Sequence, residues 1–295
     1  MTRAATASAT AEIYDPTPCV LGEGPLWHPG RGQLFWFDIL ARRVLTREGG
    51  HTRHWQFTEY VSAAGWVSDT ELMIASASRL MLFDLETGRS RDIHPLEADN
   101  PVTRSNDGRA DPWGGFWIGT MGIGAEPGAG AISRYYRGDL RTLHGAITIP
   151  NAICFAPDRS VAYFTDTPTG IIRRQRLDPE TGWPATEAEP HIDLTAEGLA
   201  PDGAVVDADG ILWSAQWGAG RVAAYNPEGR FLRAVAVPAT QATCPAFGGP
   251  TLDTLFVTSA ADGLSRETRA AEPTHGATFA IPHVATGQPE HQVLI

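Results

Sequence analysis

The sequence has little of what marks several protein classes. Its three cysteines, at positions 19, 154 and 244, are far apart and form no C-x-x-C pair, which argues against a disulfide framework or a thiolate zinc site. No run approaches the ~18 apolar residues of a membrane-spanning helix, and residues 1–12 lack the apolar core of a signal peptide. We therefore expect a protein of the reducing cytoplasm, with a flexible leader over residues 1–10 and a single domain over residues 11–295.

Basic residues are also in short supply, with 23 Lys and Arg against 34 Asp and Glu and a net charge of −11. Nucleic acids and anionic membranes are bound through Lys/Arg patches, so this balance argues against both as partners. The chain has no G-x-S-x-G elbow and no G-x-x-x-x-G-K phosphate loop, which argues against a serine esterase and a P-loop enzyme. The oligomeric state is not indicated by the sequence.

Long helical patterns are scarce too, because 31 Gly and 22 Pro interrupt the chain. What remains is a series of short apolar runs rich in aromatic and β-branched residues, each typical of a strand. The runs start at intervals of 38, 44, 46, 50 and 43 residues. They are LFWFD from Leu34, LMIAS from Leu72, FWIGT from Phe116, AYFTD from Ala162, LWSAQ from Leu212 and LFVTS from Leu255.

This period predicts an all-β, six-bladed β-propeller with four-stranded antiparallel blades, since propeller blades repeat at about 40–50 residues. Several runs are followed by a second strand and a Gly-containing turn, as in RLMLFDLETGR. The strand pattern AEIYDP from Ala11 is expected to pair with the last blade around Ile13 to Asp15 and so close the ring. A β-sandwich with accidental spacing is the alternative.

Polar residues recur at one phase of this repeat. Glu23, in LGEGP, and Asn151, in IPNAI, each lie 11 residues before the run of their blade, and Asn106 and Asp202 each lie 10 residues before theirs. Such positions begin the innermost strands, so we expect these side chains to converge on the propeller axis at one depth. Taken singly, the segments NDG and PDG are also ordinary turn sequences.

Two carboxylates and two carboxamides in a narrow channel repel and lose hydration unless a cation binds them. The donors are all oxygen atoms, which suit a hard divalent ion such as Ca²⁺, Mg²⁺ or Mn²⁺. We interpret Glu23, Asn151 and Asp202 as direct ligands of one divalent metal ion, with Asn106 bound directly or through water. The glycines on both sides of Glu23 would allow close backbone approach.

These motifs resemble the SMP-30/gluconolactonase/regucalcin family, whose members are six-bladed propellers that open sugar lactones with calcium or another divalent metal. The resemblance covers nearly the whole chain, from LGEGPLWHP through RSNDGRADPWGGFWIGTMG, TIPNAICFAPD and APDGAVVDADGILWSAQWGAGRV to PAFGGP and LFVTS. It implies that Glu23, Asn151 and Asp202 hold the metal, with Ca²⁺ favoured over Mg, Mn, Zn or Fe. It further implies that Arg104 and Asn106 contact the substrate and that Asp202 is the candidate base, with a metal-bound hydroxide as the alternative.

The chain departs from the family where some members carry an acidic pair after the GTM motif. Here the segment reads GTMGIGAEPGAGA, and Glu126 is the candidate substitute as a substrate contact. The sequence therefore predicts a lactonase acting on a small-molecule sugar lactone whose identity stays open. Two alternatives are an organophosphate or aryl-ester hydrolase with a similar metal site and a non-catalytic calcium-binding regulatory protein.

Overall fold

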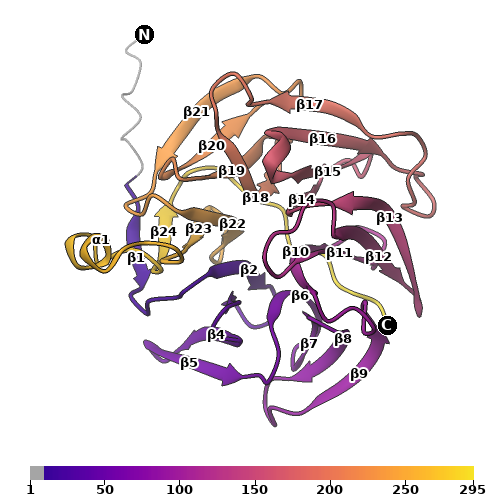
Figure 1. The fold of residues 1–295 in the computed structure, drawn as a ribbon, viewed down its shortest axis with the longest axis horizontal. Coiled ribbons are helices and arrows are strands. Elements are labelled where there is room, and N and C mark those ends of the chain that lie inside the picture. Colours follow the sequence, from indigo (N-terminus) through magenta and orange to yellow (C-terminus); the bar gives the residue numbers. More distant parts are fainter. Residues whose placement is uncertain (1–9) are drawn as a thin grey trace.

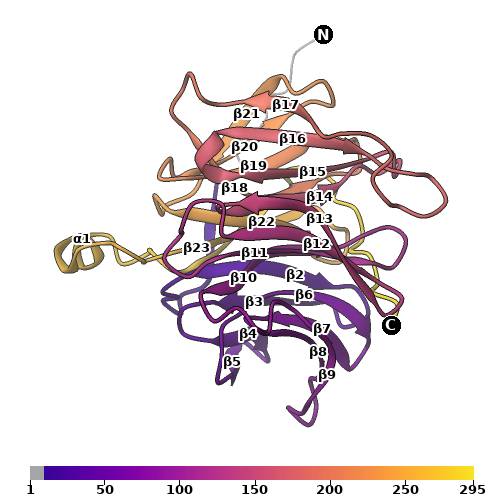
Figure 2. The same ribbon diagram turned by 45° about the vertical axis from the view of Figure 1, so that its right-hand side comes forward.

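The computed structural model describes residues 10–295, which form a six-bladed β-propeller (Figure 1). Six four-stranded antiparallel sheets surround a central axis, and in five of them the strands follow one another in sequence order. Figure 2 shows the blades obliquely, with one short helix projecting from the side of the ring. The β-sandwich alternative is therefore wrong, and the propeller prediction is confirmed.

The strands are grouped here by blade, from the axis outward. Blade 1 comprises β2 (Gly22–His28), β3 (Gln33–Asp38), β4 (Arg43–Glu48) and β5 (His51–Gln56). Blade 2 comprises β6 (Val61–Ser68), β7 (Glu71–Ser76), β8 (Arg79–Asp84) and β9 (Ser90–Pro95). Blade 3 comprises β10 (Thr103–Ala110), β11 (Phe116–Gly122), β12 (Gly130–Tyr136) and β13 (Asp139–Ile147).

The second half of the ring repeats the pattern. Blade 4 comprises β14 (Pro150–Phe155), β15 (Val161–Asp166), β16 (Ile171–Arg176) and β17 (Glu189–Asp193). Blade 5 comprises β18 (Ala200–Val206), β19 (Leu212–Trp217), β20 (Arg221–Tyr225) and β21 (Phe231–Ala236). Blade 6 comprises β22 (Ala242–Gly248), β23 (Thr254–Ser259), β24 (Thr278–Pro282) and β1 (Glu12–Asp15), and two short helices, η1 (Thr167–Thr169) and α1 (Arg266–Ala271), lie in connections.

The ring is closed by its two ends, as predicted. Strand β1 pairs antiparallel with β24, with Ile13 opposite Phe279, so the N-terminal strand completes the blade that the chain builds last. This pairing covers the outer edge of β24, which would otherwise expose unpaired backbone groups. Each of the six predicted runs starts the second strand of its blade or begins one residue inside it.

The core consists of six apolar clusters, each lying between two neighbouring blades. Trp36, Trp117 and Trp213 lie on the second strands of blades 1, 3 and 5 and are fully buried in three of these clusters. Because the blades bury their faces only against each other, the ring fixes the strands that line the axis.

Two expectations concern the bounds of the domain and the membrane. The division into a leader over residues 1–10 and one domain over 11–295 stays a prediction, and residues 1–9 lie outside the described part of the chain. Among residues 10–295, no helix has the length and apolar character needed to cross a membrane.

Candidate functional site

The predicted site residues gather where the innermost strands begin, at one end of the axis. Glu23 lies on β2, Arg104 and Asn106 on β10, Asn151 on β14 and Asp202 on β18. All five side chains are buried, with exposed fractions between 3% and 7%. The innermost strands pack against one another around the ring, so four blades contribute to one small region.

A β-bulge in each of these strands modifies the prediction of a single shared position. Glu23 and Asn151 are paired with Phe37 and Thr165 and stand just before the bulge. Asn106 and Asp202 are one residue further on, as the first residues inside the bulge. The spacings of 11 and 10 residues thus mark two adjacent positions, the last residue before the bulge and the first residue inside it.

The bulges also decide between strand and turn for NDG and PDG. Both segments lie inside innermost strands and not in hairpin turns. The second residue of NDG, Asp107, is buried at this place and accepts a hydrogen bond from the backbone N–H of Ile153 at 2.8 Å. The sequence pattern does not identify Asp107, because NDG is also an ordinary turn sequence. Its position next to Asn106 is the feature that could have indicated it.

The glycines around Glu23 are required by close backbone contacts. A Cβ on Gly22 would lie 2.5 Å from the carbonyl oxygen of Ser259 on β23, and one on Gly24 would lie 2.3 Å from that of Ser62 on β6. Gly24 also has a φ of +51°, which side chains other than glycine rarely adopt. The sequence G-E-G therefore places a carboxylate on a strand squeezed between its two neighbours.

Hydrogen bonds connect the polar residues across three blades. Arg104 Nη1 donates to Asn106 Oδ1 at 2.9 Å, and Asn106 Nδ2 donates to Asn151 Oδ1 at 3.2 Å. Asn151 Nδ2 donates in turn to the hydroxyl of Thr167, which donates to the backbone carbonyl of Pro201 beside Asp202. This chain fixes the side chains in place, so the site is organised before any ligand arrives.

The acidic residues of the site are held in an unfavourable environment. Burial is the main reason that the pKa of Glu23 is raised, and the nearby Asp107 raises it further, while the Gly24 N–H and Arg104 oppose the shift. Burial also raises the pKa of Asp202 well above its usual range, with Glu23 and then Asp107 adding to it. The charge of Arg104 offsets that of Glu23, and desolvation lowers the pKa of Arg104 itself.

This arrangement fits a hard cation. Two buried carboxylates whose pKa values are raised lower their energy when a positive ion binds between them. Asn151 Oδ1 accepts one hydrogen bond and keeps a second lone pair for an ion. Residues 10–295 contain no group of three or more His, Cys, Asp and Glu side chains that could hold a metal ion, and the predicted set differs from that pattern because its third member is an amide.

Glu126 is not brought into the buried group. It lies on the exposed loop between β11 and β12, and its Oε2 accepts a hydrogen bond from the Gly124 N–H at 3.0 Å within the same loop. Its role as a substrate contact stays a prediction.

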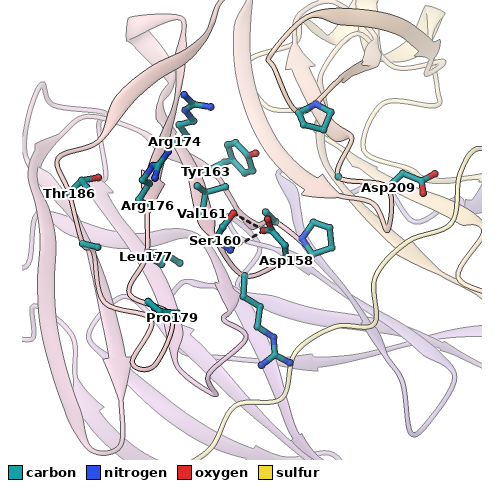
Figure 3. A pocket seen from close by; sticks show the side chains of 16 residues that line it. Asp158, Ser160, Val161, Tyr163, Arg174, Arg176, Leu177, Pro179, Thr186 and Asp209 are labelled. Atoms are coloured by element: carbon teal, nitrogen blue, oxygen red, sulfur yellow. Dashed lines mark hydrogen bonds between the residues drawn. The ribbon is translucent and has the colours of Figure 1, made fainter.

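A wide groove of about 900 Å³ lies away from the axis, between the outer parts of blades 4 and 5 (Figure 3). Arg174 and Arg176 stand on one wall, and Asp158 is bonded to Ser160 on the floor. Arg174 is already paired with Glu189 at 2.7 Å. The groove contains none of the converging acidic and amide residues, so size alone does not make it the candidate site.

Comparisons with known proteins agree with this picture. The sequence model of the family described as SMP-30/gluconolactonase/LRE-like region matches residues 21–261. A Rhizobium meliloti protein with the provisional name sugar lactone lactonase is 42% identical over 88% of this chain and 89% of its own length. L-arabinolactonase of Azospirillum brasilense is 36% identical over 91% and 90% of the two chains.

One solved structure is similar to this chain in both fold and sequence. The crystal structure of regucalcin, a calcium-binding protein from Agrobacterium tumefaciens, superimposes with a TM-score of 0.95 at 40% identity, and the match covers 98% of this chain and 100% of the other.

Proposed function

Because this chain belongs to the SMP-30/gluconolactonase/LRE-like family, we propose that it hydrolyses a sugar lactone to the aldonic acid with one bound divalent metal ion. The observation that carries the proposal is the convergence of two buried carboxylates, Glu23 and Asp202, beside the buried Arg104. The names of relatives that match over most of their length support lactone hydrolysis. A cytoplasmic location is part of the proposal and agrees with three buried, unpaired cysteines.

Glu23, Asn151 and Asp202 would hold the ion through oxygen donors, which suit a hard divalent cation, and Ca²⁺ is favoured by the similarity to the calcium-binding Agrobacterium protein. When bound, such an ion supplies a Lewis acid that polarises the lactone carbonyl and lowers the pKa of water. The bound charge also removes the repulsion between the two carboxylates.

Arg104 and Asn106 would orient the lactone. The guanidinium of Arg104 is fixed by bonds from Nη1 to Ser105 O and Asn106 Oδ1, while its Nε is buried with no partner in the described structure. A planar guanidinium gives directional hydrogen bonds to oxygen atoms. An unpaired buried donor is costly, so a substrate oxygen that reached it would be bound favourably.

Asp202 would take the proton of the attacking water. Water adds its oxygen to the lactone carbonyl carbon, the ring C–O bond breaks, and the proton removed from water goes to the leaving alkoxide, giving the open hydroxy acid. The like charges around Asp202 favour its protonated form, which makes the ionised form a better base. Glu126 would contact the sugar from the loop after β11.

The second candidate, a calcium-binding protein without catalysis, is favoured by the similarity to the calcium-binding regucalcin of Agrobacterium and by the oxygen-only donor set. It requires the same ion site but no turnover.

A pH-indicator assay separates these functions. The enzyme is given a panel of aldonolactones and one organophosphate, with Ca²⁺ and with chelator, and Asp202→Asn serves as the inactive variant. Acid release from lactones alone, lost with chelator and in the variant, supports the proposal. Calcium binding measured by calorimetry without acid release supports the second candidate, and hydrolysis of the organophosphate supports the remaining class.

A further inference from the structure

The C-terminal segment, residues 286–295, runs across the end of the propeller opposite the candidate site (Figure 1). The backbone N–H of Gly287 bonds to Leu252 O in blade 6, and the Gln288 side chain bonds to Phe155 O and Val206 O at the ends of β14 and β18. Val293 is buried between blades 2 and 3. The segment thus contacts five of the six blades.

This segment leaves almost no space at its end of the axis. The cavity between it and the innermost strands measures about 20 Å³ and is lined by residues that include Arg109, Cys154 and Glu290. A volume of this size holds about one water molecule. A sugar lactone is too large for the space between this segment and the innermost strands.

A buried ion pair joins the segment to the channel. Arg109 on β10 donates to Glu290 Oε1 at 2.5 Å, and the two side chains expose 11% and 6% of their surface. Arg109 lies two residues beyond the buried Asp107 on β10. Asp107 directly follows Asn106 of the site and accepts a hydrogen bond from the backbone N–H of Ile153, two residues beyond Asn151 on β14. The charges therefore alternate along the axis, from the tail carboxylate through the guanidinium to the acidic site.

We propose that Glu290 is a positioning residue that neutralises Arg109 and thereby sets the negative potential which the axial carboxylates offer to a divalent cation. This inference rests on the proposed function, because it concerns the same cation site. Without Glu290 the guanidinium is an unbalanced positive charge below the site, and without Arg109 the site is more negative.

The two ends of the pair therefore have opposite effects on cation affinity. Glu290→Gln weakens Ca²⁺ binding and Arg109→Met strengthens it, each by on the order of tenfold, since one unit charge changes within the same buried channel. Both substitutions lower the thermal unfolding temperature, because each leaves one buried charge without its partner. A purely structural pair would lower stability without this difference in sign.

The experiment is calorimetric titration of Ca²⁺ into the full chain, with thermal unfolding measured on the same samples. Glu290→Asp keeps the charge and is expected to restore wild-type affinity, which gives a second test if Arg109→Met does not fold. Glu228→Gln, in the exposed pair with Arg230, is the matched control and leaves affinity unchanged. Wild-type affinity in Glu290→Gln, or equal weakening in Glu290→Gln and Glu290→Asp, overturns the inference.

Failure of the proposed function gives a different result. If Glu290→Gln and Arg109→Met shift the Ca²⁺ affinity in opposite directions but the wild-type chain hydrolyses no lactone, the positioning role stands and the lactonase proposal falls. If it hydrolyses lactones but binds no divalent ion, the metal part of the proposed function and this inference fall together.

Discussion

Glu23→Gln is expected to stabilise the metal-free protein and to weaken its response to calcium. The pKa of Glu23 is raised from 4.5 to about 8, first by burial and then by Asp107. Each pKa unit corresponds to about 1.4 kcal/mol, so ionising this carboxyl in the folded protein costs at most about 5 kcal/mol. We expect about 2–3 kcal/mol of stabilisation above pH 8, because the replacing amide is itself a buried polar group.

The pH dependence follows from the same shift. A carboxyl whose pKa is higher in the folded state binds its proton more tightly there than in the unfolded chain. The metal-free wild-type protein is therefore expected to lose stability as the pH rises from about 4.5 through about 8, and Glu23→Gln removes much of that loss. Below pH 4, where the carboxyl is protonated in both states, the two proteins differ little from this cause.

Calcium is expected to reverse the order of stability. At 1,000 times its dissociation constant a ligand adds about 4.1 kcal/mol, which the wild-type protein gains and Glu23→Gln largely loses, and this gain exceeds the difference expected in chelator. The assay is thermal unfolding in chelator and in Ca²⁺ at several pH values, where 1 kcal/mol corresponds to roughly 2–4 °C for a chain of this size. Glu180→Gln, at an exposed position, is the control. A variant that is less stable than wild type in chelator at pH 8.5, or that gains as much from Ca²⁺, would refute the argument.

Three other substitutions test single steps. Asp202→Asn should lower kcat by about 10²–10⁴-fold, and excess Ca²⁺ should restore binding in calorimetry but not turnover; recovery of turnover would exclude a role as base. Arg104→Ala should lower kcat/KM about tenfold to hundredfold, as expected for a lost charged hydrogen bond, while Ca²⁺ affinity does not fall; a collapse of affinity would make Arg104 structural. Gly24→Ala should destabilise the fold by about 2 kcal/mol or more, because its Cβ would meet Ser62 O at 2.3 Å, and unfolding temperatures equal to wild type would show that β2 and β6 can separate.

Much of the architecture could be predicted because it repeats locally. The composition and period of the runs from Leu34 to Leu255 predict their strands, and the pairing of the segment around Ile13 to Asp15 with the last blade follows from the need to close a ring. Glu23, Asn106, Asn151 and Asp202 could be found because the same repeat carries them to the starts of the innermost strands. The spacings of 11 and 10 residues already separate these four residues into two sets. Only the strand pairing shows that one set lies just before a bulge and the other just inside it.

The remaining features depend on contacts between segments that share no sequence pattern. Asp107 looked like part of a turn, and only its burial between β10 and β14 makes it a charge of the site. The pair of Arg109 with Glu290 joins residues 181 positions apart, and nothing in the repeat indicates that the last ten residues cross the axis. The sequence by itself determined the fold and the chemistry of the donors, because period and residue type are local properties. Which charges face one another in the channel was decided by the tertiary structure alone, because electrostatic interaction depends on distance and burial in space.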